Sequence, residues 1–161
     1  MMKISFTNEC RKYELMITVL FLDSDDKLIC NDSTALSEDE KTILEKAGAG
    51  GSRPLKNGEL GYVAGKAGDE NAIRKAAAFL YKTAKNYSYN VVNINFSASN
   101  SNIENNRLAE IFSDALFMSD YKYDLFKKDE SIALEEVVIH LDISDKDAEN
   151  ILQKNAVITK G

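Results

Sequence analysis

Cysteine, histidine and proline are scarce in this sequence, which has two cysteines, one histidine, one proline and no tryptophan. Cys10 and Cys30 have neither a Cys-x-x-Cys partner nor a nearby histidine. We interpret them as reduced, largely buried small hydrophobic side chains, with a disulfide as the less favoured alternative. His140 has no second ligand at metal-binding spacing, which favours a hydrogen-bonded or exposed structural histidine over a general base. These shortages exclude a disulfide scaffold and a cysteine-histidine zinc site.

Long apolar runs and excess positive charge are also absent. The longest apolar run, from Leu15 to Leu22, is interrupted by Thr18 and is far shorter than the ~20 residues of a membrane-spanning helix. The start of the chain has no secretory signal, so we expect a cytoplasmic location. The 20 basic and 26 acidic side chains give a formal net charge of -6, which disfavours binding to a phosphate backbone. We predict neither a membrane nor a nucleic-acid partner.

The length of 161 residues and the 44% hydrophobic content fit one domain over residues 1–161 with a single core. Short β-branched and aromatic runs alternate with amphipathic segments that begin with helix-capping residues. We expect strands at residues 3–7, 15–22, 28–30, 62–64, 90–96 and 136–141. We expect helices that begin after Ser37, Asp69, Ser101 and Ser144. The stretch from Gly48 to Gly61 holds five of the eight glycines and the only proline, which predicts a loop.

This alternation predicts an α/β fold with a mixed, mostly parallel sheet that is flanked by helices on both faces. The run from Leu15 to Leu22 is too uniformly apolar for a half-exposed strand, so we place it in the centre of the sheet. Ligands of such folds bind beyond the carboxyl ends of the strands. The loops at residues 65–68 and 97–101 are therefore the expected places for a ligand.

Local patterns that resemble binding sites have commoner structural explanations. Gly48–Arg53 has arginine where a dinucleotide fingerprint requires its third glycine, and Gly61–Ala67 is one residue too short for a nucleotide-triphosphate loop. Ordinary turns explain both. Asp23, Asp25 and Asp26 are not followed by the glycine and glutamate of a calcium loop, so we expect a solvated hairpin turn. With no Gly-x-Ser-x-Gly elbow either, we assign no catalytic, cofactor-binding or metal-binding residue.

An aromatic-rich stretch runs from Phe112 to Phe126 and includes Phe117, Tyr121 and Tyr123. Stacking platforms for single-stranded nucleic acid combine such rings with many cations, and this stretch has few. Core packing or a protein interface is the favoured interpretation.

Two longer stretches have a recognisable order of motifs. Residues 61–80 read GYVAGKAGDENAIRKAAAFL, and residues 115–127 read ALFMSDYKYDLFK. The first resembles the strand, Gly-Lys turn and Arg-Lys-Ala-Ala helix of the amino-terminal domain of the leucyl (cytosol) aminopeptidase family. The second is similar to that family's helix end, Tyr-x-Phe-Asp-x-Tyr-Lys. Ser113-Asp114 replaces the family's Glu-Gly pair, Tyr123 and Phe126 exchange its aromatic types, and the first sixty residues match only as a pattern.

The resemblance implies a macro-domain-like three-layer sandwich of a mixed sheet between helices. It also implies a larger carboxyl-terminal catalytic domain, absent from this chain, that holds two divalent metal ions, either zinc, manganese or magnesium. The family's metal signature is Asn-Thr-Asp-Ala-Glu-Gly-Arg-Leu, and the nearest string here is Asp147–Asn150. That string lacks both flanks and opens a helix, so we treat it as a coincidence and transfer no catalytic residue.

The leading hypothesis is therefore a non-catalytic, amino-terminal accessory domain of a cytosolic leucyl aminopeptidase, which releases amino-terminal residues from peptides. The chain alone is predicted to be inactive and to hold no cofactor. Its expected partners are its own catalytic domain and further copies in a homohexamer. The alternative is a free-standing module that binds a small nucleotide-type ligand such as ADP-ribose at the strand ends. A third, weaker alternative is a purely structural oligomerisation module.

Overall fold

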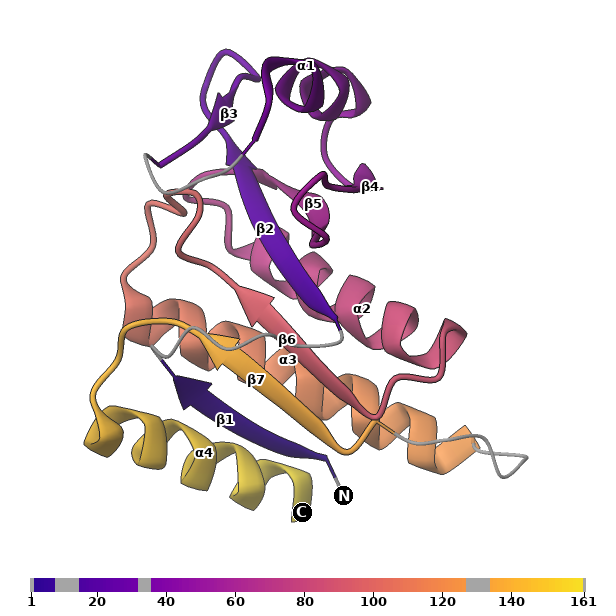
Figure 1. The fold of residues 1–161 in the computed structure, drawn as a ribbon. Helices are drawn as coiled ribbons and strands as arrows, with labels where there is room; N and C mark the ends of the chain where they lie inside the picture. Colours follow the sequence, from indigo (N-terminus) through magenta and orange to yellow (C-terminus); the bar gives the residue numbers. More distant parts are fainter. Residues whose placement is uncertain (1, 8–14, 32–35, 127–133, 161) are drawn as a thin grey trace.

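The computed structural model describes residues 2–7, 15–31, 36–126 and 134–160, and it centres on a seven-stranded sheet (Figure 1). The strand order is β1-β7-β6-β2-β5-β4, and β3 pairs with β2 alone. Neighbours from β1 to β5 in this order are parallel, whereas β4 and β3 run antiparallel to their partners. The strands are β1 Lys3–Thr7, β2 Met16–Leu22, β3 Leu28–Ile29, β4 Ser52–Pro54, β5 Leu60–Lys66, β6 Val91–Asn95 and β7 Glu136–His140.

Strand β2 occupies the centre of the sheet, as its uniformly apolar sequence predicts. It pairs with β6 on one side and with β5 on the other, and alternate side chains enter different cores. Ile17, Val19 and Phe21 belong to the larger core, and Leu20 and Leu22 belong to a smaller one. A strand that is buried on both faces has no solvent face for polar residues, which explains the missing alternation.

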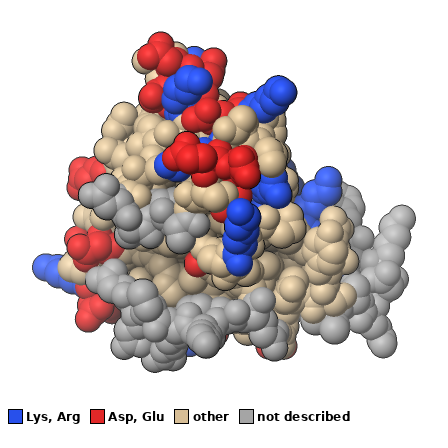
Figure 2. Space-filling view, turned by 45° about the horizontal axis from the view of Figure 1, so that its top comes forward, with Lys and Arg blue, Asp and Glu red and all other residues tan. Residues whose placement is uncertain are grey.

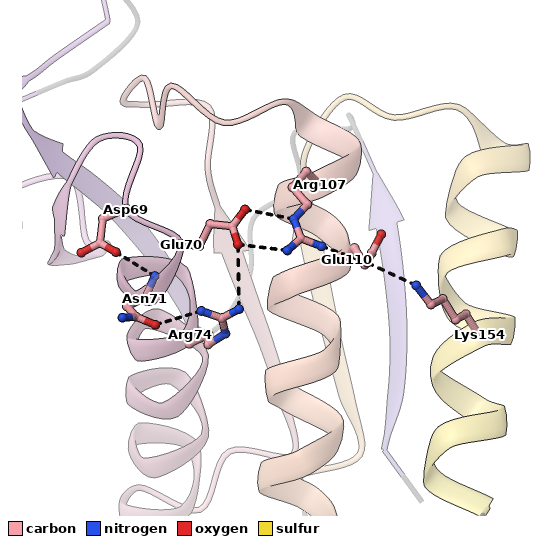
Figure 3. A network of polar contacts seen from close by, with 7 residues as sticks. All are labelled: Asp69, Glu70, Asn71, Arg74, Arg107, Glu110 and Lys154. Atoms are coloured by element: carbon pink, nitrogen blue, oxygen red, sulfur yellow. Dashed lines mark hydrogen bonds and ion pairs between the residues drawn. The ribbon is translucent and has the colours of Figure 1, made fainter.

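Four helices cover the two faces of the sheet unequally. The helices are α1 Glu38–Ala47, α2 Glu70–Asn86, α3 Asn105–Phe126 and α4 Asp145–Lys160. Helices α2, α3 and α4 lie side by side and enclose the larger core against the sheet (Figures 1 and 3). Helix α1 covers the other face, where Leu44 packs with Leu20, Leu22 and Val63. The predicted α/β architecture, with a mostly parallel sheet between helices, is thus confirmed.

Helix α2 follows its sequence signals closely. The carboxylate of Asp69 accepts a hydrogen bond from the backbone N–H of Asn71 at 2.9 Å and so caps the first turn. The predicted inward stripe is buried, with exposed fractions of 0–1% for Ile73, Ala76, Ala77, Leu80 and Ala84. Their three- and four-residue spacing places them on one face of the helix.

The prediction that the whole stretch from Gly48 to Gly61 is a loop is only partly right, because the stretch contains strand β4. Pro54 pairs with Leu60 at the outer edge of the sheet. Proline has no N–H to donate, and an edge strand is one of the few places in a sheet where that loss is tolerated. Three residues with no alternating pattern are too few for sequence periodicity to reveal a strand.

The predicted start of helix α3 at a Ser101 capping box is wrong, because the helix begins at Asn105. Asn102 has a φ of 55°, a left-handed backbone that a right-handed helix excludes. The hydroxyl of Ser101 instead accepts a hydrogen bond from the N–H of Ile103 at 3.1 Å in a local turn. Serine side chains readily form such turns in competition with helix caps. Glu104 accepts the first helical bond, from the N–H of Leu108.

The capping box predicted at Ser37 is present, and it also fastens α1 to the next loop. The Ser37 hydroxyl accepts from the N–H of Glu40 at 3.2 Å, and the Glu40 carboxylate accepts from the N–H of Ser37 at 3.0 Å. The second oxygen of that carboxylate accepts from the N–H of Lys56 at 2.9 Å. These hydrogen bonds hold the pKa of the buried Glu40 carboxyl below its ordinary value, and the bond from the N–H of Ser37 has the largest effect.

Acid is therefore expected to weaken the fold through Glu40. A pKa that is lower in the folded than in the unfolded chain gives stability above the unfolded pKa of about 4.3, and that stability is lost as the pH falls through the folded pKa. Glu40→Gln should already be less stable at neutral pH and should lose less on acidification. Urea unfolding followed by circular dichroism from pH 7 to pH 3 measures both effects. The exposed neighbour Glu38→Gln is the control, and equal pH slopes for wild type and Glu40→Gln would contradict the assignment.

Candidate functional site

The two loops singled out for a ligand lie next to each other at the carboxyl ends of the parallel strands. Residues 65–68, predicted as a loop, comprise the last two residues of β5 and the turn after it, and the loop at residues 97–101 follows β6. The backbone N–H of Gly68 donates to the carbonyl of Ser101 at 2.6 Å, which joins the two loops directly. The sheet thus brings together two segments that are separated in the sequence by the whole of α2.

A cleft of about 300 Å³ opens beside the second of these loops. Phe96 and Leu108 supply apolar surface, and polar side chains of the loop and of its neighbours supply the rest. The polar lining includes Asn31, Ser97, Ser99, Asn100, Asn105 and Asp142. The amide of Asn105 donates to the backbone carbonyl of Asp142 at 2.9 Å, so the start of α3 is tied to the segment that follows β7.

The hairpin of β2 and β3 holds the loop at residues 97–101 in place. The Ser99 hydroxyl accepts from the N–H of Phe21 at 3.0 Å and donates to the carbonyl of Ile29 at 2.5 Å. It therefore bridges two residues that face each other in the β2–β3 pair. Asn31 adds two bonds, from its N–H to the Ala98 carbonyl at 3.0 Å and from its amide to the Ser97 carbonyl at 2.6 Å. The cleft wall is consequently preformed.

The chemistry of this lining suits a neutral, hydrogen-bonding ligand. Amides and hydroxyls can donate and accept, but the described residues that line the cleft include no lysine or arginine. A diphosphate would meet the carboxylate of Asp142 there, and none of the described lining residues supplies a cation to balance the charge of the diphosphate. The Ser97 hydroxyl donates to the amide oxygen of Asn95 at 2.5 Å, which is a neutral acceptor and not a base that could activate it.

His140 lies in β7, and its Nε2 is 3.1 Å from the amide oxygen of Asn93. The hydrogen bond that was one of the two expected environments of His140 is thus present, and its structural rather than catalytic role stays a prediction. Over the described residues, no group of three or more histidine, cysteine or acidic side chains is arranged to hold a metal ion. The two-metal centre that the family resemblance implies would lie in a separate catalytic domain, so this finding does not test it.

The predicted hairpin turn at Asp23, Asp25 and Asp26 is confirmed. The Asp23 carboxylate accepts from the N–H of Asp25 at 2.8 Å and from the N–H of Lys27 at 3.0 Å. Asp26 has a φ of 61°, which short polar side chains tolerate in turns. The acidic cluster therefore shapes the β2–β3 connection.

Of the two cysteines, only Cys30 lies within the described residues. It is free and half-buried, so it is less buried than predicted. Burial raises the pKa of the Cys30 thiol, which keeps it protonated and poorly nucleophilic at neutral pH. The interpretation of Cys10 concerns a residue outside the described ranges.

No described residue of the two family-like motifs lines the cleft, although Gly68 of the first motif is bonded to Ser101 in the cleft wall. Residues 61–80 form β5, the turn after it and most of α2. Gly65 has a φ of 151°, and a Cβ there would lie 3.1 Å from the Cβ of Ala72, so glycine permits the close approach of strand and helix. Residues 115–126 form the second half of α3. Phe112, which precedes this motif, lies in the core, whereas Tyr121 within the motif is 48% exposed.

Asp120 is a structural residue that sequence reasoning missed. It is 8% exposed, and its carboxylate accepts from the Tyr81 hydroxyl at 2.8 Å and from the N–H of Met2 at 3.3 Å. It thereby joins α3 to α2 and to the start of β1. A signal existed, because Leu108, Phe112 and Leu116 precede it at four-residue intervals on the buried stripe. An acidic residue at the next position of such a stripe requires buried partners.

Charge is mixed on the face of the molecule that Figure 2 shows. In Figure 2, acidic and basic side chains lie next to each other, and neither sign forms a continuous field over the coloured part of that face. The absence of a nucleic-acid partner stays a prediction. Among the described residues, no helix combines the length and the apolar character that a membrane span requires.

Known structures with the same architecture exist, although neither a family model nor a curated protein matches the sequence. A mutant of tomato leucine aminopeptidase superposes with a TM-score of 0.62 at 10% identity, over 99% of this chain and 36% of that one. The macro domain of ganglioside-induced differentiation-associated protein 2 superposes with a TM-score of 0.60 at 12% identity, over 95% of this chain and 84% of that one. This chain therefore spans about a third of the length of the aminopeptidase. At such identities the likeness establishes a shared fold, the three-layer sandwich of macro domains.

Proposed function

We propose that this chain is the amino-terminal, non-catalytic domain of a metal-dependent leucine aminopeptidase. One observation carries the proposal, namely that nearly the whole chain superposes on about a third of the length of the tomato enzyme. The family-like motifs at residues 61–80 and 115–127 add sequence support that is independent of the superposition. The cytoplasmic location and the assembly into a homohexamer belong to the same proposal.

The structural roles of two residues in these motifs agree with an accessory role of the domain. Gly65 allows β5 and α2 to pack closely, and Asp120 joins α3 to α2 and β1. Neither residue lines the cleft at the strand ends. Motifs that serve the architecture are what a supporting domain needs, whereas catalysis by two metal ions needs converging carboxylates.

The metal ions would belong to the proposed catalytic domain. Zinc, manganese or magnesium there would polarise the peptide carbonyl and activate water. The described residues of this chain include no cluster of three or more histidine, cysteine or acidic side chains that could hold them, so no catalytic step is assigned to its side chains. Its contribution would be packing on the catalytic domain and support of the assembly.

The test compares this chain with the longer protein encoded by its reading frame. The 161-residue chain, supplied with zinc, manganese or magnesium, is expected to release no leucine from leucine amide above the buffer rate. The longer protein is expected to release it and to lose that activity with a chelator. Metal-dependent hydrolysis by the chain alone would refute the proposal. A reading frame without a metal-binding domain after residue 161 would refute it as well.

A second candidate function is the binding of a nucleotide-type ligand such as ADP-ribose. The superposition on most of a macro domain and the preformed cleft at the strand ends favour it. The lack of a cation among the described lining residues counts against it. Titration calorimetry with ADP-ribose is expected to give no saturable heat in the micromolar range. Micromolar binding that is lost in Asn31→Ala would make this candidate the leading one.

A further inference from the structure

Two opposite charges on the outer surface of α3, those of Asp114 and Lys122, form no direct ion pair in the described part of the chain. Asp114, Met118 and Lys122 are spaced four residues apart, so they form one stripe along the helix. Met118 is 47% exposed, Lys122 is exposed and Asp114 is half-buried. All three line a cavity of about 360 Å³ between α2 and α3.

The neighbouring charges, in contrast, are already paired (Figure 3). Arg107 donates twice to Glu70, at 2.9 and 3.0 Å, and once to Glu110 at 3.0 Å. Arg74 lies 3.9 Å from Glu70, and Lys154 lies 3.3 Å from Glu110. This network joins α2, α3 and α4, and each of its cations has Glu70 or Glu110, not Asp114, as its ion-pair partner.

Asp114 and Lys122 form no ion pair or hydrogen bond within the described part of the chain. Eight residues separate them, which is about 12 Å along a helix, too far for a direct contact. Burial, followed by the nearby Glu110, raises the pKa of the Asp114 carboxyl, and Lys154, Arg107 and Arg74 only partly offset this rise. A partly desolvated carboxylate of this kind gains from a cation that is brought to it from outside.

The stripe is symmetric in position and complementary in charge about Met118. If a second α3 lies antiparallel with its Met118 opposite, then each Asp114 meets the other copy's Lys122. The two contacts are equivalent, as a two-fold axis requires. Ala115 and Ser119 beside the stripe are small, which lets the helices approach, and the exposed Tyr121 adds apolar area.

We propose that two copies of this chain associate through α3, antiparallel, with a two-fold axis at Met118. The α3 surface consists of Asp114, Ala115, Met118, Ser119, Tyr121 and Lys122. A second copy fits this surface because the charge pattern complements itself, whereas an unrelated partner would need the reverse pattern by chance. The proposed function already includes assembly with further copies, and this interface names the residues of one such contact; the contact itself does not depend on a catalytic domain.

Sedimentation velocity on the 161-residue chain, over concentrations from about 1 to 300 µM, tests the proposal in the range typical of small interfaces. Wild type should shift from monomer to dimer. Asp114→Lys should weaken the dimer at least about tenfold, because each contact then opposes two cations. The double variant Asp114→Lys/Lys122→Asp should restore association. Lys46→Asp, on α1 across the sheet, changes charge away from this surface and should leave association unchanged.

Cross-linking locates the axis independently. In a Cys10→Ser/Cys30→Ser background, Met118→Cys should give a covalent dimer with a short bismaleimide, because two copies of this residue face each other. Tyr87→Cys, at a position 72% exposed at the end of α2, should not. A chain that stays monomeric at every concentration overturns the proposal and leaves the surface to another domain. A dimer that ignores the charge variants, or that cross-links equally at Tyr87, overturns it too.

Discussion

Replacing Phe112 with alanine is expected to lower the free energy of unfolding by about 3–5 kcal/mol, the usual cost of deleting a buried aromatic ring. Phe112 has no exposed surface, and its ring meets that of Phe96 edge to face at 5.0 Å between centroids. Alanine would leave a cavity between α3 and the sheet, and it would remove the aromatic pair.

Urea unfolding followed by circular dichroism measures this loss, and hydrogen exchange shows where it acts. Phe96 also lines the cleft, so the loop at residues 97–101 should exchange faster in Phe112→Ala. The control is Tyr121→Ala on the same helix, which removes a half-exposed ring and should change stability by less than about 1 kcal/mol. A similarly small loss for Phe112→Ala would contradict its place in the core.

Phe112 also illustrates which parts of the fold can be predicted from sequence. It lies on a stripe with Leu108 and Ile111, and a three- and four-residue spacing of apolar side chains identifies both a helix and its buried face. Strand β2 could be placed at the centre of the sheet for a related reason, since its unbroken apolar run requires burial on both faces. Local periodicity is sufficient where each residue's environment repeats regularly.

Strand order could not be predicted in this way. Strand β1 pairs with β7, so residues 3–7 lie beside residues 136–140 from the other end of the chain. Neither segment carries a local signal for the other, because the pairing depends on how all the helices cover the sheet. Strand β4 was not predicted for a simpler reason, because its three residues, which include a proline, are too few to show an alternating pattern. The start of α3 was predicted wrongly because the left-handed backbone conformation of Asn102 cannot be predicted from the sequence.

The position of the cleft could be predicted in part, because the loop at residues 97–101 lines it and residues 65–68 do not, and its construction could not be predicted. The rule that ligands bind beyond strand ends selects the loops at residues 65–68 and 97–101 without any structure. Their direct hydrogen bond and the Ser99 bridge between Phe21 and Ile29 arise only when three distant segments meet. That Asp114 and Lys122 form no ion pair among the described residues could likewise not be predicted from the sequence, because it depends on which partners the neighbouring charges have.

Asp120→Ala is expected to lower the free energy of unfolding by about 2–4 kcal/mol. Its carboxylate is the buried acceptor for the Tyr81 hydroxyl at 2.8 Å and for the N–H of Met2 at 3.3 Å. Hydrogen bonds to a charged group contribute about 1.5–3 kcal/mol, and a buried donor left without an acceptor costs about 1–3 kcal/mol. The exposed Asp39→Ala on α1 is the control and should cost under about 1 kcal/mol.

A double-mutant cycle separates this contact from general damage to the core. Tyr81→Phe removes one donor and keeps the ring, so it should cost less than Asp120→Ala. If the hydroxyl and the carboxylate interact, then the double variant should lose about 1–2 kcal/mol less than the sum of the single losses. Strictly additive losses would show that the two groups do not interact, and Asp120 would no longer explain how α2 and α3 are joined. A positive coupling energy would instead show that Asp120 in the second family-like motif has a structural role, independent of any catalytic domain.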